Sequence, residues 1–192
     1  MSETKINLSF DDVEKIVDNN GGQIREKASR KRTKDDEYSF EIISVLGPVS
    51  DKKGAPIVSR VRWGAHIKYD LRKWNEDMTK PYKGITFDDD EIEAIMSIPS
   101  VSIDDESDIV AVYSCEKAKA TIYHNLITLS KTEKSDGWKK EINIVDWGYG
   151  KKIDIRTWKD GYSVCGKGIG ITNEEFEKMK SLLRQERELV DG

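Results

Sequence analysis

The chain has 192 residues, of which 36% are hydrophobic and 35% charged, and its net charge is −4. This length suits one large or two small domains, while five Trp and seven Tyr argue against a disordered chain. No apolar run approaches the roughly 18 residues of a membrane span, no secretory signal opens the chain, and two cysteines are too few for a disulfide framework, so we expect a reducing, cytoplasmic compartment.

Residues 1–36 are predicted to form an N-terminal extension. Ser9 is a suitable cap for a short helix whose apolar face runs from Phe10 to Val17. Residues 25–34 carry six bases and one acid, which is typical of a basic segment.

Residues 37–98 are predicted to form a unit of four strands and one helix. A β-rich run at 38–46 is followed by a polar loop, and a second run ends at Trp63 before a turn. A third run at 68–74 reads KYDLRKW, and a loop then leads to a short apolar segment. The spacing Asp88-x-x-Glu91 is that of a capping box, which predicts the start of a helix.

Residues 99–120 are predicted to be an acidic linker with an extra strand at 109–114, and residues 121–192 a second unit. This unit has the same order, with a run at 121–129, a run into Trp147, the stretch KIDIRTW at 152–158 and a capping box at Thr172-x-x-Glu175. The helix that follows has apolar residues at helical spacing and is expected to bury Phe176, Met179, Leu182 and Leu183.

The two units repeat each other at a step of 84 residues. Between positions 63 and 98 no gap is needed, and twelve of those 36 positions recur unchanged: Trp63, Gly64, Lys68, Asp70, Arg72, Trp74, Lys83, Gly84, Ile85, Glu91, Glu93 and Ser97. We therefore expect an α+β fold made of two tandem copies of a four-stranded antiparallel sheet with a C-terminal helix.

Strand alternation places the Lys, Asp, Arg and Trp of both seven-residue stretches on one face of each sheet. In the second unit Ile153 and Ile155 are predicted to face the core, and in the first unit Ile67, Tyr69 and Leu71. Cations that follow phosphates and rings on which unpaired bases stack suit single-stranded nucleic acid. The Asp is expected to orient the guanidinium. The alternative is a covered sheet face, with Trp in the core and Arg–Asp as a structural pair.

The charges are unevenly distributed along the chain. Residues 51–83 carry nine bases and four acids, and residues 131–167 carry nine bases and six acids. Residues 84–111 carry nine acids and no base. The bases therefore accompany the aromatic stretches, which favours a polyanionic partner there despite the negative total.

Motifs of catalysis and metal binding are incomplete. The stretch GYSVCGKG at 161–168 is one residue away from a phosphate-binding loop, but Gly168 stands where a hydroxyl is needed for Mg²⁺, and no helix follows at once. The acids at 88–91 are explained by a helix start, and the two histidines form no ligand pattern. We therefore predict a protein that is not an enzyme, with no cofactor and no metal.

The combined patterns KYDLRKW…TKPYKGITF and KIDIRTW…GKGIGIT, each before a capped helix, resemble the positive cofactor four family of single-stranded-DNA-binding transcriptional coactivators, in particular its bacterial YdbC-like branch. The resemblance covers about two thirds of the chain. It implies a curved sheet with a C-terminal helix and, because both copies lie in one chain, an intramolecular pseudodimer. The loop at 163–166 lacks the Pro and one Lys of the first copy, so we expect unequal binding by the two halves.

The predicted function is binding of single-stranded DNA in transcription regulation, replication or repair, at the nucleoid in a bacterium. RNA binding and a protein-interaction scaffold remain alternatives, and transcription or replication proteins are candidate partners. The pattern and the resemblance together predict these nucleic-acid-binding residues: Trp63, Lys68, Arg72, Trp74, Lys80, Lys83, Trp147, Lys152, Arg156, Trp158 and Lys167.

Overall fold

The computed structural model describes residues 5–6, 40–103, 108–131 and 137–190. The helix predicted near Ser9 and the basic segment at 25–34 lie outside these residues. The described chain is mostly antiparallel sheet with two α-helices, which confirms the predicted α+β class.

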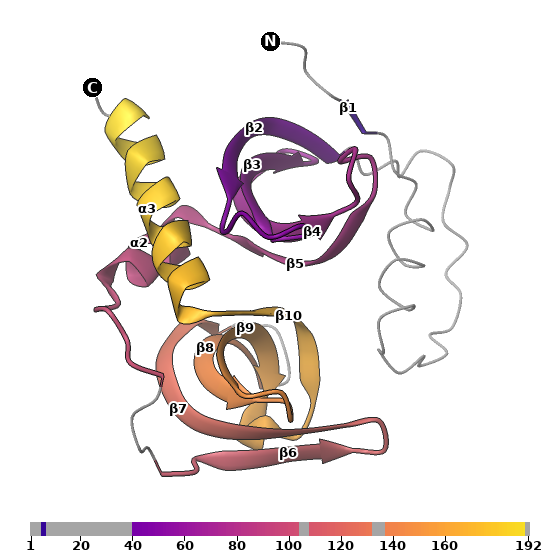
Figure 1. The fold of residues 1–192 in the computed structure, drawn as a ribbon, viewed down its shortest axis with the longest axis vertical. Helices are drawn as coiled ribbons and strands as arrows, with labels where there is room; N and C mark the ends of the chain where they lie inside the picture. The colour runs from indigo at the N-terminus through magenta and orange to yellow at the C-terminus, as the bar shows by residue number, and fades with distance from the viewer. Residues whose placement is uncertain (1–4, 7–39, 104–107, 132–136, 191–192) are drawn as a thin grey trace.

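Two antiparallel sheets follow each other along the chain, each followed by a helix (Figure 1). Sheet A has the order β1-β2-β3-β4-β5 and is followed by α2, with the bounds β1 Lys5–Ile6, β2 Phe40–Pro48, β3 Ile57–Trp63, β4 His66–Trp74, β5 Pro81–Phe87 and α2 Asp89–Ser97. Sheet B has the order β10-β9-β8-β7-β6 and is followed by α3, with the bounds β6 Ala111–Cys115, β7 Ala118–Lys131, β8 Trp138–Asp146, β9 Lys151–Lys159, η1 Asp160–Tyr162, β10 Cys165–Ile171 and α3 Asn173–Val190. Each sheet has one edge strand, β1 or β6, beyond the four predicted strands.

Both sheets curl strongly, so that each has a concave and a convex face (Figure 1). The register between β2 and β3 shifts twice, between Ile42 and Ser44 and between Val45 and Gly47. The register between β7 and β8 shifts three times within the length of β7. Such bulges bend a strand and increase its twist, which accounts for the curl.

The main hydrophobic core joins the convex faces of the two sheets with the helices. Its residues include Leu71 and Ile85 of sheet A and Ile153 and Ile155 of sheet B, which are at most 6% exposed. Helix α3 buries the four residues predicted from its spacing, namely Phe176, Met179, Leu182 and Leu183. Burial of apolar surface in this shared core holds the two sheets together.

Polar contacts also join the two halves of the chain. Lys180 of α3 is 1% exposed and donates to the Ile98 carbonyl oxygen just after α2 at 2.9 Å. Arg187 pairs with Glu93 across the two helices at 3.1 Å. A buried ammonium is stable only when it is paired or hydrogen-bonded, so the contact of Lys180 favours one relative position of the helices.

Both predicted capping boxes are present. The backbone N–H of Asp88 donates to Glu91 at 3.0 Å, and α2 begins at the next residue. The N–H of Glu175 donates to the Thr172 hydroxyl at 3.2 Å, and the N–H of Thr172 donates back to Glu175 at 2.9 Å. These side chains satisfy backbone donors that lack a partner within the helix.

Candidate nucleic-acid interface

The repeated Asp and Arg form the same ion pair on the concave face of each sheet. In β4, Arg72 donates from Nε and Nη2 to the two carboxylate oxygens of Asp70, both at 2.8 Å. In β9, Arg156 makes the equivalent bonds to Asp154 at 2.8 and 3.1 Å. The carboxylates are 0% and 1% exposed, so they orient the guanidinium groups as predicted.

Each arginine also donates from Nη1 to a carbonyl oxygen of the neighbouring strand. The acceptor is Tyr82 for Arg72, at 3.2 Å, and Gly166 for Arg156, at 3.0 Å. Burial by itself lowers the pKa of Arg156, but the charge and hydrogen bonds of Asp154 outweigh it, so the pKa is raised and the guanidinium stays charged. Three of the five N–H groups of each guanidinium are engaged in these bonds.

The prediction that Trp74 and Trp158 share a water-facing surface is wrong. Trp74 is 6% exposed and packs with Ile42 and Val61, and Trp158 is 1% exposed. Strand alternation assigns both indoles correctly to the polar face, but the curl of the sheet encloses that face at this end of β4 and β9. The alternative of a covered face with Trp in a core therefore holds at these two positions.

Trp147 is half-buried beside Trp158. The two rings are stacked, with centroids 6.0 Å apart and planes at 9°. The indole N–H of Trp147 donates to Asp154 at 3.1 Å, and the guanidinium of Arg156 lies 4.7 Å from its ring centroid. Trp147 is thus packed against Trp158 and against the Asp154–Arg156 ion pair.

A groove of about 600 Å³ lies between the two sheets. Four of the predicted binding residues line it, and they come from both halves of the chain: Trp63, Lys68, Arg72 and Lys167. Sheet B also contributes Trp138, Lys140 and Thr157, and β5 contributes Gly84, Ile85 and Thr86, while Gly166 lies at the start of β10. The groove therefore combines two indoles with four cationic side chains.

Two lysines of the groove are partly neutralised by the acids with which they pair. Lys68 pairs with Asp88 at 2.7 Å, and Lys140 pairs with Glu91 at 2.7 Å. Lys140 also donates to the Thr86 carbonyl oxygen at 2.9 Å, which connects β8 to β5. Neither Asp88 nor Glu91 lines the groove itself.

The other predicted lysines lie on the surface away from the groove lining. Lys80, Lys83 and Lys152 are exposed, and the ammonium of Lys80 lies 5.9 Å from the ring centroid of Tyr82. The structure thus brings four of the eleven predicted residues together in the groove and leaves these three outside it.

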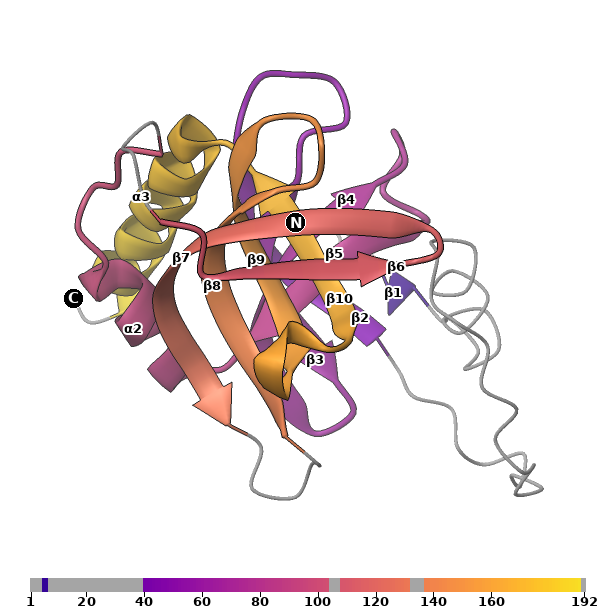
Figure 2. The same ribbon diagram turned by 90° about the horizontal axis from the view of Figure 1, so that it is seen from below.

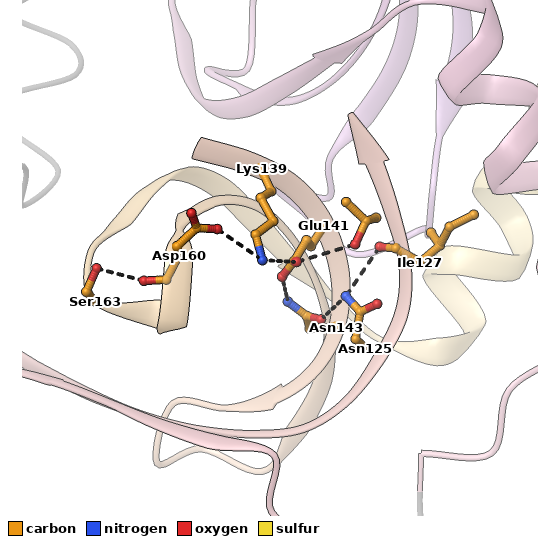
Figure 3. A network of polar contacts seen from close by, with 8 residues as sticks. Asn125, Ile127, Lys139, Glu141, Asn143, Asp160 and Ser163 are labelled. Carbon is orange, nitrogen blue, oxygen red and sulfur yellow. Dashed lines mark hydrogen bonds and ion pairs between the residues drawn. The ribbon is translucent and has the colours of Figure 1, made fainter. Parts of the chain in front are cut away.

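The interior of the concave face of sheet B holds a network of polar side chains (Figure 3). Asn125 donates to Asn143 at 2.8 Å, and Asn143 donates to Glu141 at 3.2 Å. Lys139 lies 3.7 Å from Glu141 and 3.3 Å from Asp160. The buried carboxylate of Glu141 is therefore satisfied by its own neighbours in the chain.

Within the described ranges, no group of three or more His, Cys, Asp or Glu side chains is arranged to hold a metal ion. No helix in this part of the chain is both long and apolar enough to cross a membrane.

Comparison with curated proteins finds a relative of this chain. An uncharacterized protein of Treponema pallidum (strain Nichols) is 35% identical to it over 63 residues, which are 32% of this chain and 72% of the relative. The chain belongs to the same family as this protein. The aligned length is close to that of one sheet with its helix, since β2 to α2 spans 40–97. No family model and no solved structure matches the chain.

Sequence reasoning missed Trp138 and Lys140 as residues of the groove. Both precede the repeated motif and line the groove with residues of sheet A, so neither the period of 84 nor the alternation within β9 points to them. One available signal was Gly166, where a Cβ atom would come within 3.0 Å of the Trp138 ring. The absence of a side chain there lets Trp138 lie against β10.

Proposed function

We propose that this protein binds single-stranded nucleic acid, with DNA as the first candidate, in the groove between its two sheets. The observation that carries the proposal is the meeting of Trp63 and Trp138 with the cations Lys68, Arg72, Lys140 and Lys167 in one groove. Aromatic rings with interspersed cations suit unpaired bases on a charged backbone. The resemblance to single-stranded-DNA-binding coactivators favours the same partner and a role in transcription, replication or repair.

We further infer that the two halves form an internal pseudodimer. Support comes from the shared core of the convex faces and from the ion pair between α2 and α3. The Treponema pallidum relative supports it as well, because most of its length aligns with a segment about as long as one half. A groove built from both halves would then depend on their relative position.

The groove suits a short piece of a strand rather than a long one. Its volume of about 600 Å³ lies within the range of pockets for small ligands, roughly 300–1,000 Å³. We expect one or two bases to enter it while the rest of the strand follows the surface. The acids that pair with Lys68 and Lys140 reduce the net positive charge, so we expect binding of modest affinity with a shallow salt dependence.

Two lysines provide a matched test by fluorescence anisotropy with a labelled, unstructured oligonucleotide. Both Lys167 and Lys152 are exposed, but only Lys167 lines the groove. Lys167→Ala should weaken binding and reduce the log–log salt slope by about 0.7, the contribution of one phosphate contact on a single strand. Lys152→Ala should leave both unchanged. Equal effects of the two variants would exclude the groove as the site.

Stacking is tested separately at Trp138. Trp138→Ala should weaken binding roughly 5- to 150-fold, since stacking of one base contributes about 1–3 kcal/mol. Unchanged affinity in a folded variant would refute the stacking role. If the unaltered protein forms no complex at low salt, nucleic-acid binding itself is wrong and the scaffold alternative is favoured. Competition between DNA and RNA of equal sequence separates these two ligands through the 2′-hydroxyl.

A further inference from the structure

We propose that strand β6 closes the concave face of sheet B, with Tyr113 filling the space beside Trp158, so that a nucleic-acid strand enters the groove rather than this face. This inference rests on the function proposed above. Closure of this face limits the surfaces that a nucleic-acid strand can reach, so the two halves would contribute unequally to binding.

Strand β6 continues sheet B beyond β7, and it comes from the segment between the two units (Figure 2). Tyr113 lies opposite Ala120 in the register, where the small side chain of alanine leaves room for the ring. The ring of Tyr113 is turned into the concave face and is 7% exposed. Cys165 packs against the same cluster, which connects β6 to the start of β10.

Aromatic and cationic groups surround Trp158. The Tyr113 ring meets it edge to face, with centroids 5.7 Å apart and planes at 69°. Tyr162 meets it in the same manner at 5.3 Å and 74°, and Trp147 is stacked beside it at 6.0 Å. The Arg156 guanidinium lies 5.8 Å from its ring centroid. Edge-to-face pairs of this kind are favourable, so a base would have to displace a side chain that is already well placed.

The electrostatics of this interior also oppose a phosphate. Glu141 is 4% exposed within the concave face, and its carboxylate lies in the network of Figure 3. Burial first, and then the charge and hydrogen bond of Glu141, raise the pKa of Tyr162 to about 12. A second anion entering this space would meet an uncompensated negative charge if it displaced Lys139 from Glu141.

Sheet A differs at the corresponding positions. The residues 84 positions before Glu141 and Asn143 are Ile57 and Ser59, so sheet A has no carboxylate there. The strand that extends sheet A at the edge of β2 is β1, which has two residues. Trp63, which corresponds to Trp147, lines the open groove. Trp63, Lys68 and Arg72 of the first copy thus line the groove, although Trp74 is enclosed as Trp158 is, whereas Trp147 and Arg156 of the second copy do not line it.

The test uses the unaltered protein labelled with 5-fluorotryptophan, whose five indoles are assigned by single Trp→Phe variants. Titration with an unstructured DNA oligonucleotide should shift the ¹⁹F resonances of Trp63 and Trp138. The resonances of Trp147 and Trp158 should shift several-fold less. Equal or larger shifts at Trp147 and Trp158 would overturn the closure by β6. If no resonance shifts and no complex forms, the proposed function fails instead.

A variant then tests the role of the ring. Tyr113→Ala should make the Trp147 and Trp158 resonances respond to the oligonucleotide, while Tyr149→Ala should not, since Tyr149 is 89% exposed at the turn between β8 and β9. A folded Tyr113→Ala protein, judged by circular dichroism, in which both resonances remain unresponsive would contradict the proposal. If this variant does not fold, the result with the unaltered protein decides alone.

Discussion

Lys140 makes the contact between the two halves of the molecule whose removal should have the clearest effect on stability. Its ammonium reaches from β8 to Glu91 at 2.7 Å and to the Thr86 carbonyl oxygen at 2.9 Å. It also lies 5.6 Å from the ring centroid of Phe87. Lys140→Met keeps most of the aliphatic length and removes only the charge and the hydrogen bonds.

The expected cost follows from burial of the pair. The Lys140 and Glu91 side chains are 16% and 6% exposed, so solvent screens their attraction only weakly. Loss of one partner from a buried pair costs about 3–5 kcal/mol. Glu91 keeps its hydrogen bond from the Asp88 N–H, which reduces the loss, and we expect about 2–3 kcal/mol. For a chain of this size the melting temperature should fall by roughly 4–12 °C.

Urea unfolding followed by circular dichroism measures this loss as a shift of the midpoint at constant slope. Lys53→Met is the matched control, because Lys53 pairs with Glu76 on the surface, where both side chains are about four-fifths exposed. The control should leave the midpoint unchanged. The double variant Lys140→Met/Glu91→Gln should recover part of the loss, since no buried charge is left without its partner.

Equal midpoints for Lys140→Met and Lys53→Met would refute this reasoning. The Lys140–Glu91 pair would then contribute nothing to the stability of the contact between the halves, and the groove would not depend on this pair.

Two further predictions concern sheet B. Gly168→Ala should destabilise the protein by about 2 kcal/mol or more, because its Cβ atom would lie 2.5 Å from the Ile155 carbonyl oxygen, whereas Gly170→Ala meets only ordinary contacts and should be tolerated in thermal melts. Absorbance titration should show one tyrosine that ionises near pH 12, and this transition should be absent in Tyr162→Phe. Because the pKa of Tyr162 is higher in the folded than in the unfolded protein, its contribution to stability is fully present below about pH 10 and disappears as the pH rises to about 12. Ionisation of every tyrosine near pH 10 in the folded protein would contradict the raised pKa of Tyr162.

Much of the local structure follows from the sequence alone. Alternation in KYDLRKW and KIDIRTW places Asp and Arg on the concave face of both sheets, because side chains in a strand alternate whatever lies above them. The spacing Thr172-x-x-Glu175 marks the start of α3, because a helix N-terminus needs side-chain acceptors for its free N–H groups. The extra strand predicted at 109–114 is present as β6 at Ala111–Cys115.

Tertiary structure alone decided which of these side chains meet solvent. Alternation predicts the sheet face on which Trp74 and Trp158 lie, but it does not predict how that face curves. Bulges between the strands curl the sheets until both indoles are enclosed. The groove likewise depends on residues far apart in the chain, since Trp63 lines the same groove as Trp138 and Lys140 only because the two halves share a core. A local pattern determines the direction of a side chain relative to its own strand. Its exposure depends on what the rest of the chain packs against that strand.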